Sequence, residues 1–139
     1  SIPALQETLA GKVKEQLLAR AEELLAEVRG MPNRRREILA VLCAQAAPIT
    51  IVETARQLGH DIRKSGGARD SWGEEMGSLV EDRWARKDPG KRGWSESIQF
   101  KVMSHLEVWD VSDTDVEAVV QNLIAAAAEE VVIEAVAAQ

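Results

Sequence analysis

The segment that decides the fold begins with Trp72-Gly-Glu-Glu-Met-Gly-Ser-Leu-Val-Glu-Asp-Arg-Trp84 and continues with Ala85-Arg-Lys-Asp-Pro-Gly-Lys-Arg-Gly-Trp94. The first part predicts a helix through Val80, and Trp84 is expected to fill the junction that follows it. The second part is a basic hairpin candidate, with strong turn chemistry between strands predicted at 84–87 and 98–102. We therefore expect a helix that leads directly into a basic β-hairpin.

Two shorter helices are predicted before this segment. Asn33 is expected to cap a helix that ends near Pro48. Thr50 stands three residues before Glu53, the spacing of a capping box, and starts a helix that ends at Gly59. Residues 60–71 are predicted to be a loop with Gly66-Gly67 at its centre, and Asp70 or Ser71 is expected to cap the helix that follows.

The order of these elements over residues 34–102 resembles bacterial and phage winged helix-turn-helix DNA-binding proteins. Ala55-Arg-Gln-Leu-Gly59 is similar to the first helix and turn of such a motif, and Leu79-Val-Glu-Asp-Arg-Trp-Ala-Arg-Lys-Asp-Pro-Gly90 to a recognition helix that runs into a wing. The resemblance implies a mainly α fold with a winged helix-turn-helix core at 31–109 and a small β-hairpin wing. Two features depart from the pattern: the turn after Gly59 is long, and the candidate recognition helix is acidic.

Long amphipathic helices are expected to flank this core, in segments 1–30 and 110–139. Ser112-Asp-Thr-Asp115 is a favourable start for the second helix, with acids in its first turn. Two wide apolar stripes exceed what a small core can bury, so we expect a homodimer built from residues 3–29 and 113–138. The residues predicted to form its interface are Leu18, Leu25, Val116, Val120, Leu123, Ala127 and Val131.

Charge is distributed unevenly along the chain, whose net charge is −6. Residues 31–101 carry thirteen basic and ten acidic residues, whereas 102–139 carry eight acids and no base. A basic middle with an acidic tail fits a nucleic-acid binder that has a separate assembly segment. The residues predicted to contact double-stranded DNA are Arg34, Arg35, Arg36, Arg63, Lys64, Arg69, Ser71, Arg86, Lys87, Lys91 and Arg92.

The inventory of reactive side chains argues against an enzyme. His60 and His105 are the only histidines, and they have no partners at the spacing of zinc ligands. No group of glycines has the spacing of a phosphate-binding loop. Cys43 stands alone in an apolar run, where it is expected to be buried and inert. We therefore expect no catalytic residue, no metal and no cofactor.

Three functions remain open from the sequence. The first is a homodimeric DNA-binding protein that regulates transcription. The alternative is a non-enzymatic protein-interaction or assembly factor, such as a phage or plasmid accessory protein, that binds another protein through the acidic helix at 70–82. The third is a packaging or partition component, which would show higher-order assembly. A cytoplasmic location without membrane contact is expected for all three, because no apolar run reaches the roughly 20 residues of a membrane span and no signal peptide opens the chain.

Overall fold

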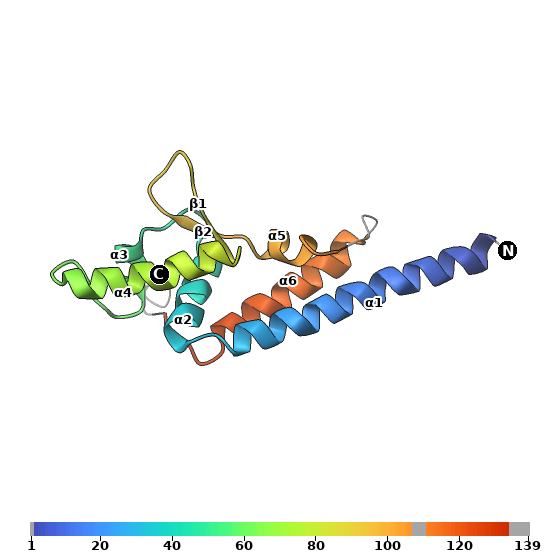
Figure 1. The fold of residues 1–139 in the computed structure, drawn as a ribbon, viewed down its shortest axis with the longest axis horizontal. Helices are drawn as coiled ribbons and strands as arrows, with labels where there is room; N and C mark the ends of the chain where they lie inside the picture. Colours follow the sequence, from blue (N-terminus) through green and yellow to red (C-terminus); the bar gives the residue numbers. More distant parts are fainter. Residues whose placement is uncertain (1, 107–110, 134–139) are drawn as a thin grey trace.

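The structure, a computed structural model, describes residues 2–106 and 111–133, with side chains described from residue 11 onward. These residues form six α-helices and one two-stranded antiparallel sheet (Figure 1). In chain order the elements are α1 (Ile2–Arg29), α2 (Asn33–Cys43), α3 (Ile51–Gln57), α4 (Gly66–Glu81), β1 (Ala85–Lys87), β2 (Trp94–Glu96), α5 (Ile98–Met103) and α6 (Asp113–Ala128). The expectation of a mainly helical chain with a small hairpin is confirmed.

The elements gather in two groups that meet at α2 (Figure 1). One group holds α3, α4 and the hairpin, and the other holds α1, α5 and α6. Helix α6 packs against α1 and also against α2, so the two groups share one hydrophobic core. Ile38, Leu39 and Leu42 of α2 are buried at their junction. The N-terminal part of α1 extends beyond α5 and α6 (Figure 1).

The apolar face of α6 is buried inside the chain, which corrects the premise of the predicted dimer interface. Leu123 and Ala127 have no exposed surface, and Val116 and Val120 are also buried. Helix α1 turns Leu17, Leu24 and Val28 towards the same core, on a shared face set by steps of seven and four residues. Because α1, α2 and α5 cover α6, its stripe needs no second chain to bury it.

Helix starts were predicted with mixed success. The Thr50 hydroxyl accepts a hydrogen bond from the Glu53 amide at 3.2 Å, and Ser112 caps α6, so both of these predictions are confirmed. Asn33 lies within α2, and Pro32 occupies the cap position without a side-chain hydrogen bond. Asp70 and Ser71 lie inside α4, which starts at Gly66 because Ser65 caps it by accepting from the Ala68 amide.

The first predicted strand is confirmed and the second is wrong. β1 pairs with β2, with Ala85 opposite Glu96 and Lys87 opposite Trp94. Residues 98–102 belong to α5 instead. Ile98 and Val102 are both fully buried, and their separation of four residues places them on one face of a helix.

The C-terminal helix is shorter than predicted. α6 ends at Ala128, and Glu130 has a φ of 61°, which breaks the helical path before Val131. Val131 therefore lies beyond the helix on which it was placed. The predicted domain boundary at 109/110 and the end of the predicted helix at 134–138 lie outside the described residues. Among the described helices, none combines the length and the apolar character needed to cross a membrane.

Candidate nucleic-acid interface

The β1–β2 hairpin is attached to the body of the protein through Ile49, just before α3. The Ile49 amide donates to the Trp94 carbonyl at 3.0 Å, and the Trp94 amide donates to the Ile49 carbonyl at 2.8 Å. Gly93 makes this approach possible, because it has a φ of +139° and a Cβ there would lie 2.8 Å from the Ile49 nitrogen. The predictions missed this short extended segment at Ile49. The signal for it in the sequence is the position of Ile49 between Pro48 and the helix cap Thr50.

Trp84 fixes the other end of the hairpin, as predicted for the junction with α4. Its side chain has no exposed surface, and its carbonyl accepts a hydrogen bond from the Ser97 amide at 2.8 Å. The Ser97 hydroxyl donates to the Arg83 carbonyl at 3.1 Å. These bonds close the base of the hairpin, so its turn projects from a fixed platform.

The hairpin carries four basic residues, Arg86, Lys87, Lys91 and Arg92. We call them the hairpin group. All four are exposed, and none forms an ion pair with another described residue. Asp88, the acid between them, accepts a hydrogen bond from the Gly90 amide inside the turn. Arg83, which the predictions missed, is also exposed at the base of the hairpin, where its φ is 65°. The hairpin therefore presents unneutralised positive charge.

A second basic group lies where the chain enters α4, and we call Arg63, Lys64 and Arg69 the loop group. All three are exposed, as is the neighbouring Ser71. Arg63 forms an ion pair with Asp61 at 2.8 Å. Hydrogen bonds from the Arg63 side chain, and then from its amide, lower the pKa of Asp61 to about 2. Lys64 and Arg69 have no ion-pair partner in the described part of the chain, so they carry most of the group's available charge.

The run Arg34–Arg36 has structural partners instead of a free surface. The Arg35 Nε donates to the Glu75 carboxylate at 2.9 Å, which ties α2 to α4. Arg36 donates to the Glu129 carbonyl at the end of α6. The Arg34 guanidinium lies 4.1 Å from the centre of the Trp72 ring, and its Nη1 is 3.6 Å from Glu37. We therefore remove this run from the set of residues predicted to contact phosphates.

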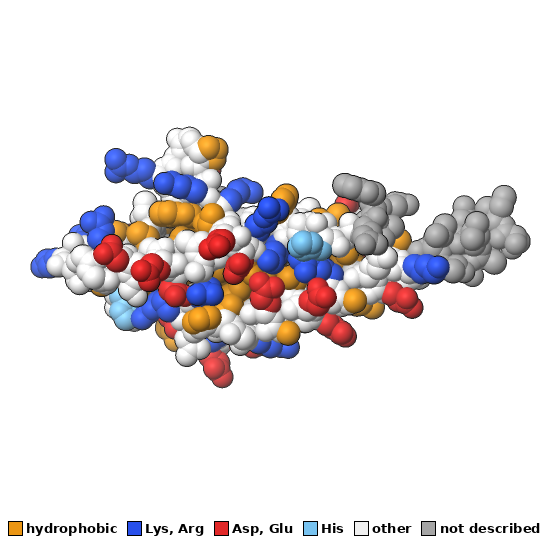
Figure 2. All heavy atoms as spheres, in the orientation of Figure 1, with side chains coloured by type: hydrophobic (Ala, Val, Ile, Leu, Met, Phe, Trp, Pro, Cys, Tyr) orange, Lys and Arg blue, Asp and Glu red, His pale blue; other side chains and the backbone are white. Residues whose placement is uncertain are grey.

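The outward face of α4 is acidic. Asp70, Glu74 and Glu81 recur at steps of four and seven residues, so they share one face of the helix, and all three are exposed. Figure 2 shows Lys and Arg side chains around the hairpin and at the end of α4, with Asp and Glu side chains along the middle of that helix. Positive charge thus flanks a negative surface.

The residues predicted for a dimer interface are not gathered on one exposed surface. Leu18 on α1 is 55 % exposed and Leu25 is half-buried, whereas four of the five predicted on the C-terminal helix are buried and Val131 is half-buried beyond its end. An interface through α6 would require the core to open. The homodimer stays a prediction without the support of that face.

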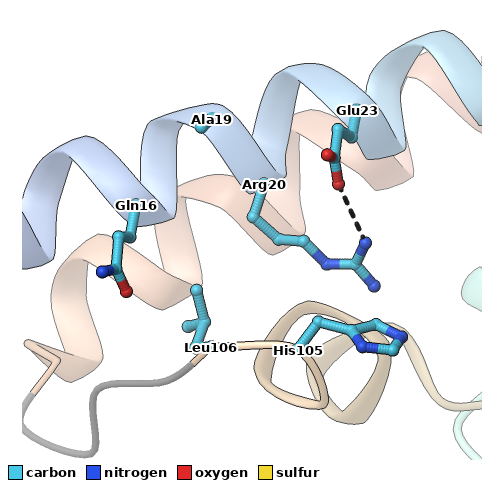
Figure 3. Close-up of a pocket in the computed structure, with 6 residues that line it drawn as sticks. All are labelled: Gln16, Ala19, Arg20, Glu23, His105 and Leu106. Carbon is cyan, nitrogen blue, oxygen red and sulfur yellow. Dashed lines mark hydrogen bonds and ion pairs between the residues drawn. The ribbon is translucent and has the colours of Figure 1, made fainter.

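A groove of about 540 Å³ lies between α1 and the residues after α5 (Figure 3). Arg20 reaches across it from α1, and its guanidinium bonds to Glu23 at 3.2 Å and to the Lys101 carbonyl at 3.1 Å. His105 and Leu106 line the opposite side. Glu23 matches the charge of Arg20, and the hydrogen bond from Arg20 to the Lys101 carbonyl joins α1 to α5.

Reactive groups are scarce in the described residues. No cluster of three or more His, Cys, Asp or Glu side chains is placed there to hold a metal ion. Cys43 is half-buried and not fully buried as predicted. Desolvation, and secondarily the charge of Glu96, raises the pKa of its thiol to about 12, so the thiol is a poor nucleophile at neutral pH. The arrangement of side chains described above thus offers charge and shape for binding.

Comparison with known proteins yields no match for this chain, whether among protein-family models, curated proteins or solved structures.

Proposed function

We propose that residues 33–96 form a winged helix-turn-helix that binds double-stranded DNA. The order α2, Ile49 bridge, α3, α4 and hairpin supports this fold, because the bridge supplies a short third extended segment beside the hairpin. The observation that carries the function is the hairpin group, four exposed bases without ion-pair partners among the described residues. Such a hairpin suits phosphate contacts, which fix the position of a protein on a duplex.

The binding surface that we propose extends from the hairpin group to the loop group. Lysine and arginine side chains release counterions when they neutralise phosphates, so affinity for the duplex depends steeply on salt. Arg69 and Lys64 stand at the first turn of α4 and just before it, where exposed helix amides also favour anions. The hairpin group and the loop group would contact the phosphate backbone of one DNA duplex at two separate places.

A salt titration with a labelled duplex of about two helical turns tests this function. Four phosphate contacts from the hairpin group alone predict a slope of log affinity against log salt near about −3.6, or about a hundredfold loss between about 50 and 200 mM NaCl. Each further contact from the loop group steepens the slope by about 0.9. Binding that is absent at the lower salt concentration, or that does not change with salt, would contradict the proposal.

The alternative function is a protein-interaction or assembly factor that uses α4, and the acidic outward face of that helix favours it. Exposed carboxylates at 70, 74 and 81 are suited to a basic protein surface and repel phosphate. The same titration separates the two functions, because an interaction factor would bind the duplex weakly at every salt concentration. We favour DNA, since the unpaired charge on the anchored hairpin has no role in this alternative.

A further inference from the structure

The exposed surface of α4 has few of the side chains that read purines. Arginine, lysine, asparagine and glutamine make the paired hydrogen bonds that distinguish purines in the major groove. Arg69, in the first turn, is the only residue of these four types in α4. The rest of its exposed surface consists of glycines, Ser71 and the carboxylates of Asp70, Glu74 and Glu81.

The glycines of α4 reinforce this point. A Cβ added at Gly66, Gly67, Gly73 or Gly77 would meet no atom within 4 Å, so packing inside the chain does not require any of them. Gly73 and Gly77, in the interior of the helix, each cost about 1 kcal/mol of helix propensity relative to alanine. Seven of the nine exposed positions of α4 are therefore either glycine or acidic.

The positive charge is placed away from this surface, in two groups at opposite ends of α4. The loop group stands where α4 begins, and the hairpin group follows its C-terminal end. Contacts to phosphate from such groups set the register of a protein on the duplex and carry no sequence information. The exposed carboxylates between them would repel the phosphates of a bound duplex.

We infer that this chain recognises double-stranded DNA by its backbone and shape, at two separate places, and that α4 does not select a base sequence. This inference rests on the proposed DNA-binding function. In this inference α4 is not a recognition helix. It separates the two basic groups that contact the DNA. The class of partner is then any B-form duplex long enough to reach both groups.

The test measures binding to several duplexes that share one base composition but differ in base order, alongside selection from a randomised duplex pool. We expect affinities within about fivefold of one another and no enriched motif, because each base pair that a protein reads is worth at least about fivefold. A motif, or a larger spread, would overturn the inference while leaving the proposed function intact. Absence of binding to every duplex at low salt would overturn both.

A variant of α4 makes the test specific to this helix. Glu74→Ala with Glu81→Ala removes two exposed acids seven residues apart, and Glu15→Ala with Glu22→Ala on α1 is the matched control. We expect the α4 variant to change affinity by one common factor for every duplex, as phosphate repulsion is lost. A factor that differs more than about fivefold between duplexes would show base reading by α4 and overturn the inference.

Discussion

The indole Nε1 of Trp84 donates a hydrogen bond to the Glu27 carboxylate at 2.9 Å, across 57 residues of sequence. This bond joins the start of the hairpin to α1. Lys101 completes the arrangement, with its Nζ 3.6 Å from the same carboxylate oxygen and 5.2 Å from the centre of the Trp84 ring. The hairpin is therefore held by α1 and α5 as well as by α4.

Replacing Trp84 with Phe should destabilise the protein by about 1–3 kcal/mol, because the Glu27 carboxylate loses a partly buried donor and the smaller ring leaves space in the core. Urea unfolding gives the change in free energy. Glu27→Ala, which removes the acceptor, and the double variant complete a cycle in which the two losses should not add, since the residues are in contact. Additive losses would show that the hydrogen bond contributes nothing.

Gly93→Ala should detach the hairpin from Ile49. The backbone conformation at φ +139° is strained for any L side chain, and the new Cβ would meet the Ile49 backbone at 2.8–2.9 Å. We expect a loss of about 1–3 kcal/mol from strain alone. Gly90→Ala is the matched control on the same turn, where a Cβ meets no atom within 4 Å. Equal stability of the two variants would contradict this account of the anchor.

Leu123→Ala should cost about 2–5 kcal/mol, because Leu123 is fully buried in the core between α6 and its neighbours. Leu18→Ala, at a position that is 55 % exposed, should change stability little. If the core lies within one chain, the loss at Leu123 is independent of protein concentration. A melting temperature that rises with concentration in the wild type, and no longer does so in Leu123→Ala, would restore the α6 dimer interface.

Cys43 should react slowly with a thiol reagent in the native protein. With a pKa of about 12, its thiolate fraction at pH 8 is about one in ten thousand, whereas a cysteine in an unfolded chain is about one quarter ionised. We expect labelling to be at least about a hundredfold slower in buffer than in guanidinium. Equal rates would show that the thiol is accessible.

The same raised pKa makes stability depend on alkaline pH. Above about pH 8.5 the unfolded chain releases the thiol proton while the folded chain keeps it, so the free energy of unfolding falls as pH rises towards 12. The contribution is at most about 1.4 kcal/mol per pH unit. Cys43→Ala should remove this part of the slope, and an unchanged slope in that variant would refute the assignment.

Local signals in the sequence predicted much of the fold. Thr50 with Glu53 and Ser112 with Asp115 are caps whose partners are three residues away, so spacing alone identifies them. The turn at 88–93 has equally local chemistry. The separation of four residues between Ile98 and Val102 also indicates a helix. A strand was predicted there instead because the segment follows a strong turn sequence.

What the sequence did not predict depends on contacts between distant residues. Arg35 bonds to Glu75, 40 residues away, and Arg36 to a carbonyl 93 residues away, so a run of three arginines that suggested DNA contact instead joins helices. The dimer prediction failed in its premise for a related reason. The apolar area of α6 could be counted from the sequence, but the helices that cover it could not.

The central claim is that the hairpin group contacts DNA phosphates, and the salt dependence of duplex binding tests it most directly. Lys91→Ala with Arg92→Ala should flatten the slope of log affinity against log salt by about 1.8, since each lost phosphate contact removes about 0.9. Lys12→Ala with Lys14→Ala, an equal charge change at exposed positions of α1, should leave the slope as in the wild type. A hairpin variant whose slope and low-salt affinity match those of the wild type would contradict the account.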